Sequence, residues 1–226
     1  MDGDDNWFIS DEHYETGKTI DYHAGVINSK SKGNIVNPDE YIERYGADSL
    51  RMYLMFMGPF DQGGDFRDSA MEGVSRWVGR IWRMAQGSLA KSRGAGSRSA
   101  AGQQSNTPTA TIATALHKAI KKVGDDLEKR RYNTAIATLM EFTNLVADEG
   151  GILTVPELQM FIKLIAPLAP HLAEELWQQA QGRSEISDPQ DSVHRQEWPA
   201  YDVKALREDT IQLVVQVNGK TRGVFA

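Results

Sequence analysis

The sequence predicts a mainly α-helical protein that ends in a β-hairpin. Between residues 68 and 192, apolar side chains recur every three or four positions, which is the spacing of helices that bury one face. Over residues 211–217 apolar and polar residues alternate instead, and Asn218-Gly219 then gives a strong hairpin-turn signal. The 226 residues include no cysteine, so disulfides and thiolate-bound metals are excluded.

The first 25 residues show little periodicity, and a loop of small and basic residues follows them. Residues 29–32 alternate two serines with two lysines, whose ammonium and backbone N–H groups suit a polyphosphate. A short helix is expected directly behind the loop, because Asn37 can cap it, Pro38 fits its first turn and Gly46 can end it. A second short helix should follow, with one face formed by Leu50, Tyr53, Leu54 and Met57.

Longer helices are expected from residue 69 onward. Ser69 and Glu72 have the spacing of a capping box at the start of the first one. Its predicted core face carries Val74, Trp77, Val78, Ile81, Trp82 and Ala85. Residues 87–107 are mostly glycine, serine, alanine and glutamine, so they cannot offset the entropy of ordering and predict a flexible link.

The remaining helices complete a predicted bundle. One helix is expected to bury Ile112, Leu116, Ile120, Val123 and Leu127. Asn133 is expected to cap the next helix, and Thr154 with Glu157 forms a second capping box. Pro167 and Pro170 should separate the last two helices, with His171 making a structural hydrogen bond. The pattern therefore predicts about four or five antiparallel helices.

A resemblance to a known family covers most of the chain, from about Tyr14 onward. Residues 29–51 resemble the second nucleotide-binding motif of class I aminoacyl-tRNA synthetases, the KMSKS loop, together with the helical segment behind it. Residues 55–59 and 215–223 are similar to leucyl-tRNA synthetases in particular, whereas 166–177 is shared with other synthetases for aliphatic amino acids. Ile27 and Asn28 stand where the family motif has lysine and methionine, so Lys30 alone keeps a motif lysine.

The resemblance implies a domain organisation. The expected fold is mainly α, with a KMSKS-type loop and short connecting helices, an antiparallel bundle of the class I synthetase anticodon-binding type, and a final β-hairpin. Residues 1–25 would be a remnant that precedes the catalytic loop, and residues 26–67 would hold the loop and connecting helices. Residues 68–192 would form the bundle, and 193–226 a C-terminal extension.

The resemblance also implies a function, namely the C-terminal part of a leucine–tRNA ligase. The expected substrate is ATP with Mg²⁺, and the predicted catalytic residue is Lys30. The predicted ATP-binding residues are Ser29, Lys30, Ser31 and Lys32. The predicted tRNA-binding residues are Arg76, Arg80, Arg83, Lys118, Lys121, Lys122, Lys220 and Arg222. Expected partners are tRNA(Leu) and an N-terminal catalytic half, in cis or in trans, without which the chain should be inactive; no resident metal is expected.

Two other classes of function stay open. The change at Ile27 and Asn28 favours a noncatalytic RNA-binding helical module derived from a synthetase. The basic helix faces also fit the ordinary solvent-exposed surface of an inert helical scaffold.

The net charge of −6 argues against a protein that coats nucleic acid generally. No apolar stretch approaches the roughly 20 residues that span a bilayer. A cytoplasmic protein without a membrane partner is therefore expected.

Overall fold

The computed structural model describes residues 37–59, 61, 66–95, 110–183, 188–206, 213–217 and 220–225. Seven α-helices lie within this part: α2 (Pro38–Tyr45), α3 (Ala47–Phe56), α4 (Asp68–Ala95), α5 (Ala110–Glu128), α6 (Tyr132–Asp148), α7 (Val155–Ile165) and α8 (Pro170–Ala180). Three short 3₁₀ helices follow them, η2 (Pro189–Asp191), η3 (Val193–Arg195) and η4 (Lys204–Leu206). The prediction of a mainly helical protein is confirmed.

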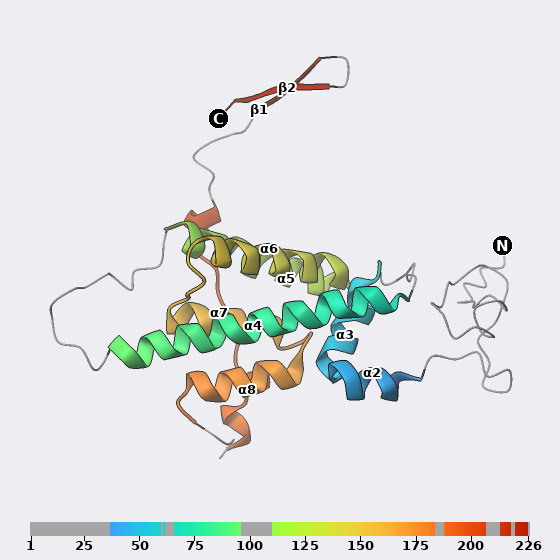
Figure 1. The fold of residues 1–226 in the computed structure, drawn as a ribbon. Helices are drawn as coiled ribbons and strands as arrows, with labels where there is room; N and C mark the ends of the chain where they lie inside the picture. The colour runs from blue at the N-terminus through green and yellow to red at the C-terminus, as the bar shows by residue number, and fades with distance from the viewer. Residues whose placement is uncertain are drawn as a thin grey trace, which may run out of the picture.

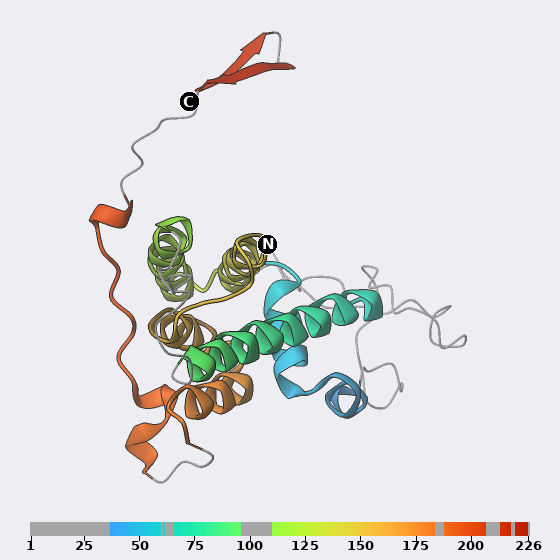
Figure 2. The same ribbon diagram turned by 60° about the vertical axis from the view of Figure 1, so that its left-hand side comes forward.

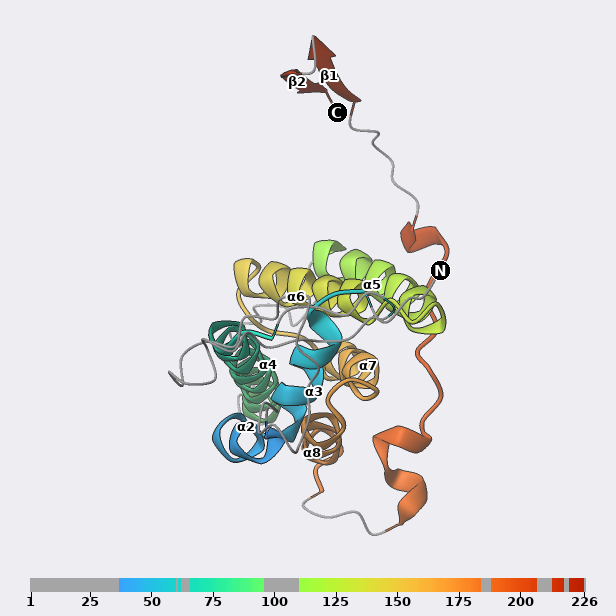
Figure 3. The ribbon, with the colours of Figure 1, turned by 90° about the vertical axis from the view of Figure 1, so that its right-hand side faces the viewer.

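The helices form a bundle around α4. This long helix runs through the middle of the molecule, with the α5–α6 pair on one side and α8 on the other (Figure 1). It contacts α2, α3, α6, α7 and α8, while α5 packs against α6 and α7. Figure 3 shows the bundle from one end, with α2 and α3 beside α4.

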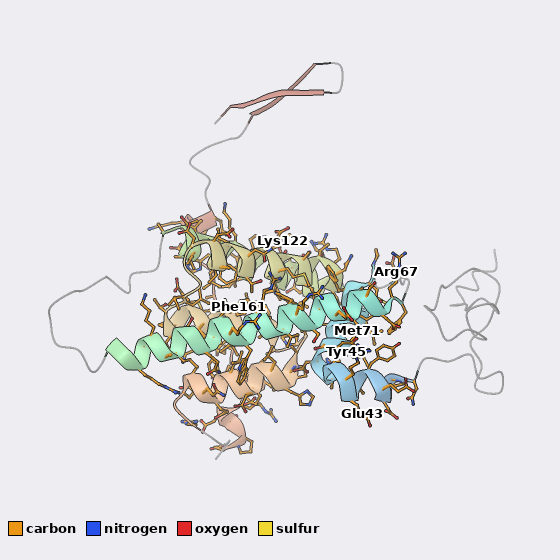
Figure 4. The ribbon with its side chains drawn as sticks, viewed as in Figure 1. Glu43, Tyr45, Arg67, Met71, Lys122 and Phe161 are labelled. Carbon is orange, nitrogen blue, oxygen red and sulfur yellow. The ribbon has the colours of Figure 1, made fainter. Side chains whose placement is uncertain are left out.

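The core of the bundle is aliphatic and aromatic. Ile81, Ile136, Leu139 and Phe161 are fully buried, and the rings of Phe142 and Phe161 lie 5.4 Å apart between centroids. Figure 4 shows Phe161 in the centre, among the helices. Burial of apolar surface is the main driving force for such a fold, and it follows the helical periodicity read from the sequence.

Several predicted helix ends are confirmed. The Asn37 side chain accepts a hydrogen bond from the Asp39 N–H (3.1 Å), and Gly46 ends α2 with a φ of 86°. This left-handed region favours glycine because it has no Cβ. At α7 the predicted capping box is present: Glu157 Oε2 accepts from the Thr154 N–H (2.9 Å), and Thr154 Oγ1 accepts from the Glu157 N–H (3.4 Å).

Two predicted caps were wrong. The helix α4 begins at Asp68, so Ser69 lies inside its first turn and cannot cap it. The Asp68 carboxylate accepts a hydrogen bond from Tyr41 Oη (2.7 Å). The helix α6 begins at Tyr132 rather than behind Asn133. The chain turns earlier because Arg130 adopts a φ of 56° and the Arg131 N–H bonds to the Asp126 carbonyl (2.7 Å).

The flexible link does not begin at residue 87, because α4 continues to Ala95. Ser88 Oγ donates to the Met84 carbonyl (2.8 Å) and accepts from the Leu153 N–H (2.9 Å), and Leu89 is buried. These contacts with the residues before α7 stabilise two further helical turns. Residues 96–109, the rest of the predicted link, lie outside the described part.

Two predicted core positions are also exposed. Trp77 is buried as expected, but Trp82 is 37% exposed. Leu54 of α3 is 50% exposed, while Met52 takes a buried position that the predicted face did not include. In α3 and α4, the buried face is therefore rotated slightly about the helix axis from the face predicted by the sequence.

A buried carboxylate joins α3 to α8. Asp48, in the first turn of α3, accepts hydrogen bonds from the Leu172 N–H (2.6 Å) and from His171 Nδ1 (2.9 Å). The first N–H groups of a helix have no partner within the helix, so an acidic side chain there is stabilising. The predicted structural hydrogen bond of His171 is confirmed.

Beyond the bundle, β1 (Leu213–Val217) pairs antiparallel with β2 (Lys220–Phe225). The register pairs Leu213 with Phe225 and is irregular between Val215 and Gln216.

Among the helices that the structure describes, none combines the length and apolar character needed to cross a membrane.

Candidate functional site

The predicted ATP-binding residues lie outside the described part of the chain. This applies to Ser29, Lys30, Ser31 and Lys32, and also to Ile27 and Asn28. Their roles stay predictions. Lys220 and Arg222 lie in β2, where the structure describes the backbone path and the strand pairing.

The predicted arginines of α4 are exposed, and one of them, Arg80, contacts a neighbouring helix. Arg76 pairs with Glu72 of its own helix (3.7 Å), and Glu72 also faces Arg44 of α2 (3.9 Å). Arg80 donates to Asn144 Oδ1 of α6 (3.1 Å), and Arg83 is also exposed. These contacts are solvent-accessible, so they leave the guanidinium charges available at the surface.

The predicted lysines of α5 line one groove. This lysine groove has a volume of about 450 Å³ and is bounded by Lys118, Lys121, Lys122, Asp125, Asp126, Arg131 and Leu206. It lies along α5, near the turn into α6, and Figure 4 shows Lys122 on that side of the molecule. The α4 arginines do not line this groove. The structure thus brings together three of the eight predicted tRNA-binding residues.

Ion pairs hold two of these lysines in place. Lys121 Nζ lies 2.5 Å from Asp125 Oδ2, and Lys122 Nζ lies 2.7 Å from Asp126 Oδ2. The hydrogen bond with Asp125 raises the pKa of Lys121, and the bond from Lys121 lowers the pKa of Asp125. Four cationic and two carboxylate side chains line the groove, so it keeps a formal excess of two positive charges.

Asp126 pairs with two of the cations that line the groove. Its side chain is only 1% exposed, and its two oxygens contact Lys122 (2.7 Å) and Arg131 (2.7 Å). Burial alone would raise the pKa of this carboxyl, but hydrogen bonds from Lys122 and Thr134 and the charges of Lys122 and Arg131 outweigh burial and lower it. The same residue therefore fixes both the α5–α6 turn and the position of two cations.

We expect Asp126→Asn to change the pH dependence of stability. A carboxyl whose pKa is lowered in the folded state stabilises the fold above its ordinary value of 3.8, and this contribution is lost as the pH falls through the lower folded value. At neutral pH the variant should lose about 1–3 kcal/mol of unfolding free energy, and its stability should fall less steeply in acid.

Urea unfolding followed by circular dichroism from about pH 7 to pH 2 measures this slope. Asp125→Asn is the matched comparison, because Asp125 makes a similar pair but its side chain is 46% exposed, so its loss should change the stability and the acid slope less than Asp126→Asn does. Equal acid slopes for the wild-type chain and Asp126→Asn would contradict the prediction.

Sequence reasoning did not include Arg131, Asp126 or Leu206 in the site. The three lysines share a helix, so their spacing alone suggested a common face. Arg131 reaches the groove only because the α5–α6 turn brings it back, and Leu206 comes from η4, far along the chain.

No group of three or more histidine, aspartate or glutamate side chains suited to a metal ion is found among the described residues.

Family models match both parts of the chain. The model described as "Anticodon-binding domain of tRNA ligase" matches residues 110–225, which include the whole lysine groove. The model described as "tRNA synthetases class I (M)" matches residues 22–75, which include the predicted loop.

Relatives and a solved structure agree with these matches. The chain is 42% identical to a leucine–tRNA ligase of Rubrobacter xylanophilus, over 86% of this chain and 22% of that protein. It is 40% identical to a leucine–tRNA ligase of a Synechococcus strain, over 93% and 25%. A crystal structure titled as the ternary LeuRS-tRNA-LeuAMS complex of Agrobacterium radiobacter K84 is similar with a TM-score of 0.68 and 31% identity, over 89% and 25%. The chain thus spans about a quarter of the length of these relatives.

Proposed function

Since the chain belongs to the tRNA ligase anticodon-binding family and is homologous to the C-terminal part of leucine–tRNA ligases, we propose that it serves the ATP-dependent attachment of leucine to tRNA(Leu). The bundle would hold the tRNA and the loop at residues 29–32 would contact ATP. The observation that carries the proposal is the lysine groove, which lies inside the matched anticodon-binding region. The proposed role places the protein in the cytoplasm.

The loop would act on the activation of leucine. In that reaction the leucine carboxylate attacks the α-phosphate of ATP and pyrophosphate leaves, so negative charge develops on the phosphate oxygens. A positioned ammonium group stabilises such charge without forming a bond. We assign this role to Lys30, with Ser29, Ser31 and Lys32 supporting the loop. These residues offer no carboxylate, so Mg²⁺ would be held by the ATP phosphates rather than by the loop.

The bundle would hold tRNA through its phosphates. Contacts from lysine and arginine to phosphates position a nucleic acid without reading its bases. Lys118, Lys121 and Lys122 present such groups in one groove, and Arg76, Arg80 and Arg83 present others along α4. Lys220 and Arg222 in β2 complete the proposed set. The structural neighbour that contains tRNA supports this role.

The chemistry would need a further part of the enzyme. We infer that the pocket for leucine belongs to an N-terminal catalytic half, present in cis or in trans, because the chain spans about a quarter of its relatives. Leucine-dependent exchange of pyrophosphate into ATP should be absent for the chain alone. It should appear when the N-terminal part of a leucine–tRNA ligase is added, and strong exchange by the chain alone would contradict this division.

We expect Lys118→Ala with Lys121→Ala to weaken the binding of leucine tRNA. Each lost phosphate contact should lower the slope of log affinity against log salt by about one. Fluorescence anisotropy with labelled leucine tRNA over a series of salt concentrations measures this slope. Lys122 is left intact because it pairs with the buried Asp126.

Lys91→Ala is the matched control for this measurement, because Lys91 is an exposed lysine on α4 outside the groove. An unchanged salt slope for the double variant would contradict phosphate binding in the groove.

The noncatalytic RNA-binding module is the second candidate function, and the altered Ile27 and Asn28 are the observation that favours it. The relatives favour the ligase over this module.

A further inference from the structure

The segment 196–206, here called the strap, crosses the outside of α5. It follows η3 and ends in η4, which contacts α5, and Figure 2 shows it as the orange-red segment that runs past the bundle. The Asp202 N–H bonds to His117 Nδ1 of α5 (3.3 Å). Leu206 at its end forms part of the lysine groove. The strap and the groove therefore belong to one surface.

Two aromatic rings of the strap are unusually accessible. Trp198 is 42% exposed and Tyr201 is 40% exposed. Trp198 lies over Gly124 of α5, since a Cβ built on that glycine would be 3.3 Å from the indole Nε1. Pro199, between the two rings, is buried. Trp198 is therefore packed on α5, and much of the surface of both rings faces solvent.

Tyr201 lies next to the cationic groove. The pKa of Lys121 is raised mainly by its bond to Asp125, and the nearby Tyr201 acts in the same direction. The next residue, Asp202, bonds to His117 of α5, so the Tyr201 ring lies on the side of α5 that carries the groove lysines. Proteins that bind single-stranded nucleic acids combine these two features, because bases stack on aromatic faces while phosphates contact cations.

We propose that Trp198 and Tyr201 stack on unpaired bases of an RNA whose phosphates lie in the lysine groove. This proposal rests on the proposed function and adds to it a preference for unpaired nucleotides. Bases inside a duplex are already stacked on each other, so they do not offer their faces to these rings. A protein segment is the less suitable occupant, because apolar contacts between proteins avoid lysines at their centre.

The test uses the full chain and two labelled RNAs. One probe is an unstructured oligoadenylate of about ten nucleotides, and the other is a duplex of the same length. Fluorescence anisotropy gives the dissociation constants of the wild-type chain, Trp198→Ala, Tyr201→Leu and Trp198→Phe. Trp82→Ala is the matched control, because Trp82 is similarly exposed but lies on α4.

Loss of either stacking face should weaken single-strand binding about tenfold and leave duplex binding unchanged. The salt slope should stay constant, since stacking releases no counterions. Trp198→Phe should retain most of the affinity because it keeps a ring, and Trp82→Ala should behave as wild type. If Trp198→Ala does not fold, Tyr201→Leu decides the question, because it keeps apolar volume without the aromatic face.

Equal losses on both probes, or no loss on the single strand, would overturn the stacking proposal. Binding of leucine tRNA by the wild-type chain separates this result from the proposed function. If the wild-type chain binds that tRNA while Trp198→Ala and Tyr201→Leu bind both probes normally, stacking is refuted and the proposed function stands. If the wild-type chain binds no RNA even at low salt, both proposals fail.

Discussion

Trp77→Ala should destabilise the chain by about 3–5 kcal/mol, the usual cost of truncating a buried tryptophan. Trp77 is 1% exposed in the middle of α4, and its indole Nε1 donates to Thr143 Oγ1 of α6 (2.9 Å). Truncation would remove apolar contacts, leave a cavity and break this link between two helices. Since domains are stable by only about 5–15 kcal/mol, the loss would take a large share of the total.

Urea unfolding followed by circular dichroism measures this effect. Trp82→Ala on the same helix is the matched control, because Trp82 is 37% exposed and its truncation should cost clearly less than that of Trp77. Trp77→Phe removes the hydrogen bond to Thr143 and part of the buried ring, so it should cost more than about 1 kcal/mol but less than Trp77→Ala. Similar losses for Trp77→Ala and Trp82→Ala would contradict the packing described for α4.

Lys30→Ala should lower leucine activation by about 10²–10³-fold in the assembled enzyme, the usual loss when one transition-state charge contact is removed. The expectation rests on Lys30 as the retained lysine of the KMSKS-type motif, with Ile27 and Asn28 in place of the preceding pair. Leucine-dependent pyrophosphate exchange, with the N-terminal part supplied, measures the reaction. Binding of leucine tRNA should not change, because the proposed tRNA contacts lie on the bundle and in β2.

Lys32→Ala is the matched control for this reaction, because Lys32 is the other lysine of the loop. A much smaller loss for Lys32→Ala would support Lys30 as the group that stabilises the phosphates. Equal losses would mean that the two lysines share the charge. Unchanged exchange for Lys30→Ala would favour the noncatalytic RNA-binding module instead.

Sequence reasoning succeeded where the cause of a structure is local. The caps at Asn37 and at Thr154 with Glu157, and the helix end at Gly46, depend on residues within a few positions of each other. The lysines of the groove were also found together because they share one helix face. Such signals need no knowledge of the tertiary structure.

It failed where the cause lies far along the chain. The helix α4 passes residue 87 because Ser88 bonds to Leu153, 65 positions away. Periodicity gave Trp77 and Trp82 the same face, but only the packing of α6 decides that Trp77 is the buried one. Leu206 in the groove and Trp198 over Gly124 likewise depend on the strap folding back across α5. The loop at residues 29–32 remains a prediction from sequence.

The bond from Asp48 to the start of α8 makes the junction of α3 and α8 a poor hinge. Opening it would leave a carboxylate without partners in a buried place and expose unpaired amides at the helix end, both of which are costly. The two helices should therefore move as one rigid body. With the proposed roles, a shift of the segment that follows the nucleotide loop would move α3 and α8 together, and it would reach the tRNA contacts through α4, which packs against both helices.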